Sequence, residues 1–279
     1  MIVDTHAHVW WPQDGHRVLI RERVPSLDTD FRFERLLPDL DPAGVGSVVL
    51  VSAAQSFAET QRLLDTAARF PARVAGVIGF LDMRAPDFED RLAAACLHKA
   101  FKGLRLPLVV FEDADWIRDK RVGRALAALA ARGLVAQVLA GPQHLSACAD
   151  VLADHPDLKA VIDHAGNPGA QELDEGPWRQ GLAAVGRRTR ALCKVGNFAL
   201  PAGPLPDRER HDWILAHVVA SFGWDRLLYG SNWPVSTLQQ TYADVLAQLH
   251  ATAKQLGLDA QALDRATTAN ARRIFGLGA

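Results

Sequence analysis

Ile2-Val3-Asp4-Thr5-His6-Ala7-His8 begins with a short apolar run and ends with two histidines two positions apart. Side chains at positions i and i+2 of an extended strand point to the same side of that strand. We therefore expect a first β-strand that presents His6 and His8 together at its carboxyl end. Imidazole is the commonest metal ligand in proteins and a general acid–base near neutral pH. The segment therefore predicts a chemical site at the end of this strand.

Seven further short apolar runs follow the first, separated by longer amphipathic segments. Several are continuous runs of valine, leucine and isoleucine, which is typical of parallel strands covered on both faces. The eight expected strands lie at Ile2–Thr5, Gly46–Ser52, Val74–Phe80, Phe101–Leu106, Leu134–Leu139, Ala160–His164, Leu192–Val195 and Leu227–Gly230. Apolar residues at helical spacing predict helices at Phe57–Phe70, Arg121–Arg132, Gln143–Asp154, Asp207–Phe222 and Asp259–Phe275.

This alternation of strands and helices predicts an α/β fold, a single (β/α)8 TIM barrel over residues 1–279. An open, doubly wound sheet is the alternative, but no G-x-G-x-x-G motif follows the first strand. Residues 9–33 form a long first loop rich in charged and aromatic residues, and long loops inside compact domains are commonly functional. The helix at Asp259–Phe275 closes the chain.

The bulk composition excludes several classes of protein. Apolar residues make up 49% of the chain, charged residues 23%, and the net charge is -1, so nothing indicates attraction to nucleic acid or an anionic membrane. No apolar segment approaches the roughly 20 residues that span a bilayer. The cysteines, Cys96, Cys148 and Cys193, are widely spaced and predict no disulfide framework. We expect a cytoplasmic protein, monomeric or homo-oligomeric, without a signal peptide.

Active sites of such barrels lie at the carboxyl ends of the strands, so polar residues there are candidates for function. Six of the eight predicted strands end in polar or charged groups, which is more than a structural barrel requires: Asp4, His6 and His8; Lys102 and Arg105; Gln137; Asp163 and His164; Lys194 and Asn197; Ser231, Asn232 and Trp233. The three histidines are the candidates for metal binding, and together with Asn232 they are the candidates for catalysis. We expect Asp4 and Asp163 to face away from the barrel axis and to orient loops or the imidazoles.

The basic residues at the strand ends have two interpretations each. A guanidinium buried without a partner is costly, so Arg105 requires either a substrate carboxylate or an internal acid. Lys102 and Lys194 either contact a substrate or extend aliphatic stems toward solvent. Trp233 forms either a pocket wall or a packing contact. Together with Gln137, these are the candidate substrate-binding residues.

Six ordered segments carry a family pattern: Val3-Asp4-Thr5-His6-Ala7-His8-Val9-Trp10, Lys102-Gly103-Leu104-Arg105, Ile162-Asp163-His164-Ala165-Gly166-Asn167-Pro168, Lys194-Val195-Gly196, Tyr229-Gly230-Ser231-Asn232-Trp233-Pro234 and Thr268-Ala269-Asn270-Ala271-Arg272-Arg273-Ile274-Phe275. Over nearly the whole chain they resemble the amidohydrolase superfamily, in its amidohydrolase-2 (amidohydrolase-related) branch. Within it the chain looks most similar to sugar-acid and muconate-type lactonases, such as L-fuconolactonase, L-rhamnonolactonase and 2-pyrone-4,6-dicarboxylate lactonase.

The resemblance implies roles for individual residues. His6 and His8 become metal ligands or stabilisers of an oxyanion. His164 becomes the electrophile that polarises a lactone carbonyl, and the third histidine available to a metal. Arg105 becomes a contact for a substrate anion or hydroxyl. The fifth strand lacks the histidine of binuclear members and no bridging lysine is evident, so we expect at most one divalent metal, zinc, bound weakly or absent.

Asn232 departs from the family pattern, which places an aspartate there to take a proton from the attacking water. An amide is no useful base near neutral pH and brings no charge to a cation. Three explanations are open: another base such as His164 or one of the paired histidines, a natural relative with reduced or altered activity, or an introduced substitution that traps a substrate.

The sequence therefore predicts a hydrolase of the lactonase type, which opens a sugar-acid or carboxylated lactone by water attack on the carbonyl. The expected partner is a small-molecule lactone or organic acid. One alternative is a metal-assisted decarboxylase of an aromatic or unsaturated acid, which Asn232 disfavours because such enzymes need a full ligand set. The other is a non-catalytic, ligand-binding relative.

Overall fold

The computed structural model of the chain describes residues 1–11, 24–111, 113, 115–168, 176–198 and 208–278. Its eight strands are parallel and lie in the order of the sequence, which confirms the predicted barrel. The strands are β1 (Ile2–Ala7), β2 (Val45–Val51), β3 (Val74–Gly79), β4 (Phe101–Pro107), β5 (Val135–Leu139), β6 (Lys159–Ile162), β7 (Leu192–Gly196) and β8 (Leu227–Gly230).

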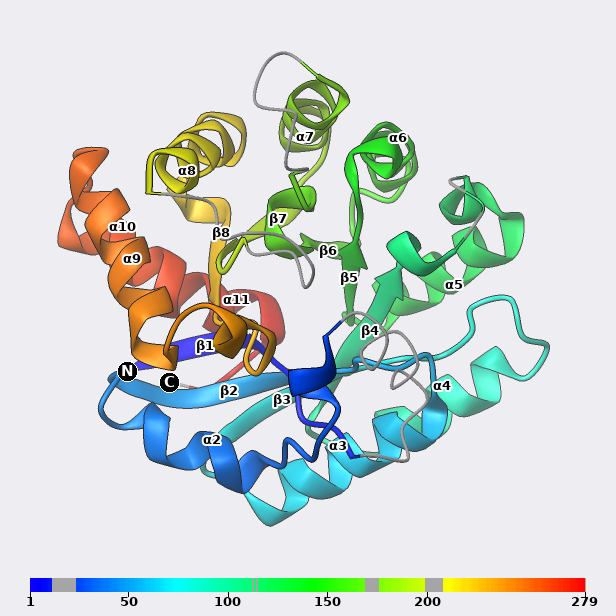
Figure 1. Ribbon diagram of the computed structural model, residues 1–279. Coiled ribbons are helices and arrows are strands. Elements are labelled where there is room, and N and C mark those ends of the chain that lie inside the picture. Colours follow the sequence, from blue (N-terminus) through cyan, green and yellow to red (C-terminus); the bar gives the residue numbers. More distant parts are fainter. Residues whose placement is uncertain (12–23, 112, 114, 169–175, 199–207, 279) are drawn as a thin grey trace.

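Helices surround these strands (Figure 1). They are α2 (Phe33–Leu40), α3 (Phe57–Arg69), α4 (Phe88–Cys96), α5 (Lys120–Ala131), α6 (Leu145–Ala153), α7 (Pro177–Arg188), α8 (Arg208–Phe222), α9 (Tyr242–Gln255), α10 (Ala260–Asp264) and α11 (Asn270–Phe275). Side chains at several helix starts accept backbone N–H groups, such as Ser56 before α3 and Thr241 before α9. A π-helical segment at Arg265–Ala269 joins α10 to α11, so the segment predicted as the last helix is helical in three consecutive pieces.

The closure between the first and last strands depends on the chain that follows β8. The Thr5 hydroxyl donates to the Tyr229 carbonyl at 2.7 Å. The His8 amide donates to the Trp233 carbonyl at 2.6 Å, and the Asn232 amide donates to the His6 carbonyl at 2.8 Å. The eighth-strand loop is therefore hydrogen-bonded directly to the histidine segment.

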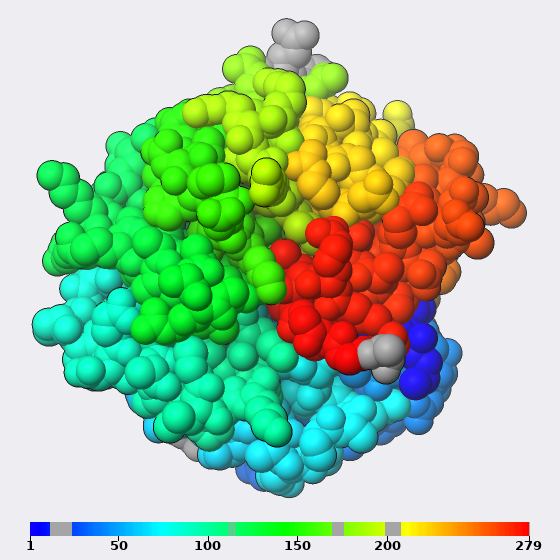
Figure 2. Space-filling model, turned by 180° about the vertical axis from the view of Figure 1, so that it is seen from behind, coloured from blue at the N-terminus to red at the C-terminus, as the bar shows by residue number. Residues whose placement is uncertain are grey.

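Alternate strand residues form two separate apolar layers. One layer packs with α11 at the amino end of the barrel and contains Val3, Val49, Val51, Ile78, Val135, Val161, Leu192 and Leu228. The other layer packs against the surrounding helices and includes Val48, Leu50, Leu104 and Ile162. Figure 2 shows the C-terminal segment, in red, on the face seen from behind. The apolar interior thus fills the amino end of the barrel and leaves its carboxyl end to polar side chains.

The end of β6 and the first loop are the two places where the described chain departs from or falls short of the predicted elements. The sixth strand was expected to reach His164, which is wrong: β6 ends at Ile162 because His164 and Ala165 have left-handed backbones, with φ of 47° and 52°. The middle of the predicted first loop, residues 12–23, lies outside the described residues. The described ends of that loop pair through a bridge between Trp10 and Phe31. Among the described residues no helix is long and apolar enough to cross a bilayer.

The three cysteines differ in their access to solvent, which gives a first prediction. Cys96 is exposed, whereas Cys148 and Cys193 are buried, and burial raises the pKa of Cys148 to about 12. Because the thiolate is the reactive form, a chromogenic disulfide reagent should modify Cys96 quickly in the native protein and the other two only after denaturation. Rapid native modification of Cys148 or Cys193, located by peptide mass spectrometry, would contradict this packing.

Candidate active site

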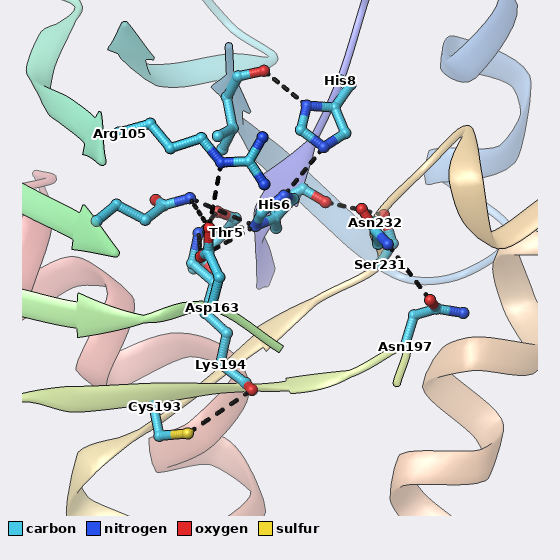
Figure 3. Close-up of polar contacts among 12 residues, drawn as sticks. Thr5, His6, His8, Arg105, Asp163, Cys193, Lys194, Asn197, Ser231 and Asn232 are labelled. Carbon is cyan, nitrogen blue, oxygen red and sulfur yellow. Dashed lines mark hydrogen bonds and ion pairs between the residues drawn. The ribbon is translucent and has the colours of Figure 1, made fainter. Parts of the chain in front are cut away.

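The two histidines of the first strand meet as predicted. His6 lies in β1 and His8 directly follows Ala7, and both are buried. Their Nε2 atoms are 3.1 Å apart, and His8 Nδ1 lies 2.8 Å from the Val51 carbonyl oxygen (Figure 3). A carbonyl can only accept, so His8 carries its proton on Nδ1. Its Nε2 lone pair therefore accepts from His6 Nε2, because His6 Nδ1 itself accepts from Lys194 Nζ at 3.2 Å.

His164 joins this pair through an unusual backbone. Its φ of 47° falls in the left-handed region, which is uncommon for a residue other than glycine and is concentrated at functional sites. The turn brings the His164 ring to 4.4 Å from the His6 ring, measured between centroids. Three imidazoles from two distant segments therefore share one space at the carboxyl end of the barrel.

Asp163 points into the barrel, which corrects the expectation that it faces away. Its side chain lies on the same face as that of Val161, two residues earlier, and Val161 belongs to the interior layer. One carboxylate oxygen, Oδ2, accepts from Arg105 Nε at 3.3 Å and from Gln137 Nε2 at 3.1 Å. The other, Oδ1, lies 3.4 Å from His6 Nδ1 and 3.6 Å from Lys194 Nζ. Asp163 is therefore the central anion of the site.

Burial and charge together set the protonation of this cluster. Burial alone raises the pKa of Asp163, but Lys194, His6 and Arg105 outweigh it and hold that pKa well below its usual range. Burial is also the main reason that the pKa of His164 falls to about 4, and the pKa values of His6 and His8 fall well below 6.5. The three imidazoles are therefore neutral near pH 7 and keep their lone pairs.

Three of the predicted substrate-binding residues, Lys194, Arg105 and Gln137, have partners inside the protein. Lys194 is fully buried, and its Nζ donates to the Thr5 carbonyl at 2.7 Å, so it does not extend toward solvent. Burial lowers the pKa of Lys194 to about 8. Arg105 finds the internal acid that its burial requires, Asp163, and its Nη1 also donates to the Ser52 carbonyl at 2.9 Å. Gln137 is buried between Asp163 and His6.

Lys102 lies elsewhere, and the structure does not bring it together with the other candidate substrate-binding residues. It lines a cavity of about 440 Å³ together with Met1, Val3 and Arg272, at the starts of the strands. Arg105 follows three residues later, and a strand advances roughly 3.3 Å per residue. Lys102 is therefore about 10 Å nearer the amino end of the barrel than Arg105. Two residues of one short strand can thus lie at opposite ends of the barrel.

The loop after β8 is held against the histidines by Asp4. Its carboxylate accepts from the Ser231 amide at 2.9 Å, from the Ser231 hydroxyl at 2.6 Å and from the Tyr242 hydroxyl at 2.9 Å. It also accepts from the His6 amide at 3.0 Å. Burial raises the pKa of Asp4, against these hydrogen bonds. Asp4 thus orients a loop and the first strand, as predicted.

Asn232 and Trp233 extend the site from this loop. Asn232 has a φ of 58°, and its Nδ2 lies 3.4 Å from Asn197 Oδ1. Asn197, whose backbone hydrogen-bonds to the His164 ring, therefore connects the sixth and eighth strand ends. Trp233 is buried and packs on Phe31, with ring centroids 5.5 Å apart. The structure therefore favours a packing role for this tryptophan.

One group of side chains could hold a metal ion. Ligand atoms of His6, Asp163 and His164 all lie within 4.8 Å of one another, so Asp163 joins two of the three histidines predicted as ligands. Among the described residues, no donor forms a hydrogen bond with the buried Oδ1 of Asp163. Two imidazoles and a carboxylate are a donor set that suits zinc. The residues present therefore fit one divalent ion, with His8 beside it as a further predicted ligand.

Comparison with known proteins agrees with this geometry. A family model described as amidohydrolase matches residues 3–277. The chain is 31% identical over 247 residues to an L-fucono-1,5-lactonase of Burkholderia ambifaria, covering 88% of this chain and 85% of that protein. A second L-fucono-1,5-lactonase, from Burkholderia multivorans, is 30% identical over 264 residues, with 87% and 85% covered. An amidohydrolase crystal structure from Burkholderia multivorans with bound zinc superposes with a TM-score of 0.91 at 27% identity, covering both chains completely.

Proposed function

We propose that this chain, which belongs to the amidohydrolase family, is a lactonase. It opens a sugar-acid lactone by adding water to the ring carbonyl. The observation that carries this proposal is the meeting of His6, His8 and His164 around Asp163 in a chain so similar to two lactonases. No observation in the site favours decarboxylation.

The neutral histidines supply the groups that ester hydrolysis needs. We assign His164 to the carbonyl, where an imidazole N–H stabilises negative charge as it develops on oxygen. Lys194 Nζ and Gln137 Nε2 donate to His6 Nδ1 at 3.2 and 3.4 Å and orient that ring, and Asp163 contacts both donors. Asn232 offers no proton acceptor, so the lone pairs of the imidazoles are the acceptors left for the attacking water. This substitution predicts a slow native enzyme, since a positioned base typically contributes 10²–10⁴-fold.

A zinc ion would be held by His6, Asp163 and His164, in keeping with the zinc-bound amidohydrolase structure. When bound, such an ion polarises a carbonyl oxygen and lowers the pKa of coordinated water. The carboxylate of Asp163 supplies the only negative charge in that ligand group. Because Asn232 adds no second one, we expect weak zinc retention after purification.

The proposal is tested with a panel of sugar-acid lactones and a pH indicator that reports acid release. The protein is examined after metal removal and after zinc loading. We expect turnover of at least one 1,5-lactone of a six-carbon sugar acid, with faster turnover in the zinc-loaded form. Tight binding of sugar acids without any hydrolysis in either form would support the ligand-binding alternative instead.

Arg105 gives a further prediction about the substrate. Its Nε and Nη1 are engaged by Asp163 and Ser52, and we propose that its remaining edge contacts a substrate carboxylate or hydroxyl. Arg105→Lys keeps a positive charge beside Asp163 but loses the planar fork. It should raise KM about tenfold while kcat changes little, as expected for uniform binding. Unchanged steady-state kinetics with lower thermal stability would restrict Arg105 to a structural role.

A further inference from the structure

Glu59, near the start of α3, is fully buried, and its carboxylate is fixed by backbone groups outside the helix. Oε1 accepts from the Ala53 amide and Oε2 from the Ala54 amide, each at 2.9 Å. Ser56 and Glu59 have the spacing of a capping box, in which the acid would return to the Ser56 amide. Ser56 does accept from the Glu59 amide, but the Glu59 carboxylate binds the amides two and three residues before Ser56 instead.

The segment that Glu59 fixes is the end of β2, which orients two residues of the active site. The Val51 carbonyl accepts from His8 Nδ1 at 2.8 Å and thereby sets the tautomer of His8. The Ser52 carbonyl accepts from Arg105 Nη1 at 2.9 Å. The next two amides, those of Ala53 and Ala54, are the ones that bind Glu59. Four consecutive residues therefore connect the carboxylate to an imidazole and a guanidinium.

We propose that Glu59 is a positioning residue for the active site, acting through the end of β2 on the tautomer of His8 and the orientation of Arg105. The expected effect on rate rests on the proposed hydrolysis. The expected effect on the orientation of His8 and Arg105 does not depend on any reaction. Glu59 forms no hydrogen bond with either residue, so it acts on them only through the end of β2.

The chemistry of the carboxylate explains why a glutamate is required there. Two N–H groups point at it from adjacent residues, and a carboxylate can accept both, whereas an amide presents one oxygen and one donor. Burial raises the pKa of Glu59, whereas the two amides and the charge of Arg105 lower it and so favour the ionised form. A buried acid is costly unless it is hydrogen-bonded, and these two amides supply the hydrogen bonds.

Thr60, the next residue, offers a matched control. Its buried hydroxyl accepts from the Phe80 amide at 2.8 Å and donates to the Phe80 carbonyl at 3.1 Å, at the end of β3. No residue that we place in the site follows β3. Thr60→Val removes these hydrogen bonds at nearly constant volume, so it tests loss of a strand-end anchor without a connection to His8 or Arg105.

The experiment compares Glu59→Gln with Thr60→Val in two measurements. The first is the ring N–H signal of His8 in a ¹⁵N-histidine NMR spectrum, identified by its loss in His8→Ala. We expect Glu59→Gln to shift or broaden this signal and Thr60→Val to leave it in place. The second is lactone hydrolysis, where Glu59→Gln should lower kcat/KM about 10- to 100-fold, as losses around ligating histidines do, and Thr60→Val less than threefold.

The outcomes separate the two proposals. An unchanged His8 signal and unchanged kcat and KM in Glu59→Gln would overturn the positioning role, whatever its effect on thermal stability. A changed signal in a protein that hydrolyses no lactone would support the positioning role and reject the proposed function. If Glu59→Gln does not fold, Glu59→Asp keeps the carboxyl group but shortens the reach, and it should displace the same signal.

Discussion

Asn232→Asp should raise kcat on the best lactone by about 10²-fold or more, because it supplies a carboxylate as a proton acceptor on the loop after β8. The backbone N–H of residue 232 donates to the His6 carbonyl at 2.8 Å whatever the side chain, and aspartate tolerates the left-handed backbone found there. Among the described contacts, the buried Nδ2 of Asn197 has no partner, and this amide, once turned, can donate to the new carboxylate. Steady-state kinetics measure the gain.

The affinity for zinc should also rise in Asn232→Asp. A carboxylate is a far better zinc ligand than an amide, so competition with a chromogenic chelator should show tighter zinc binding by Asn232→Asp. Asn197→Asp is the matched control, since it adds the same charge one hydrogen bond away. A lower kcat in Asn232→Asp than in the native protein would mean that a histidine has already taken over as the base. His8→Ala and His164→Ala would then identify which one.

Asp163→Asn should cause the largest loss of stability. The carboxylate faces Arg105, Lys194 and His6 in a fully buried site, and removing one partner of a buried ion pair costs about 3–5 kcal/mol. Chemical denaturation at pH 7 measures this loss of unfolding free energy. We also expect kcat to fall at least 10-fold, because the acid that contacts Gln137 and Lys194, the two donors to the His6 ring, is gone.

The pH dependence and a control make this prediction specific. The pKa of Asp163 is depressed in the folded protein, so its contribution is fully present above the ordinary value of 3.8 and is lost only as the pH falls below it. The difference between the two proteins should therefore stay constant from pH 7 to pH 5. Asp150→Asn also removes an acid that binds two arginines, but on the surface, and should cost much less. Equal losses in the two variants would contradict the central role of Asp163.

Much of the site could be predicted because strand periodicity is local. Two histidines at i and i+2 after an apolar run require no tertiary information to be placed together, and their Nε2 atoms are 3.1 Å apart. The same reasoning failed at Asp163, which was expected to face outward. Its side follows from Val161 before it, whereas the left-handed backbone at His164 breaks the alternation that was used to place the pair.

The grouping of Lys102 with Arg105 neglected their distance along β4. Lys102 and Arg105 were grouped because they occupy one short strand, yet Lys102 lines the cavity at the amino end and Arg105 reaches Asp163. The spacing of Ser56 and Glu59 in the sequence is that of an ordinary helix cap. Only the folded chain shows that the Glu59 carboxylate binds the end of β2 instead.

Local periodicity and residue chemistry were therefore enough for the eight strands, the order of the barrel and the pairing of His6 with His8, since each depends on neighbours in the chain. The charge environment of Asp163, the internal role of Lys194 and the hydrogen bonds of Asn232 depend on residues 30 to more than 200 positions away. Burial and electrostatic interactions act through space, with strengths set by distance and solvent exposure. Only the tertiary structure fixes those quantities.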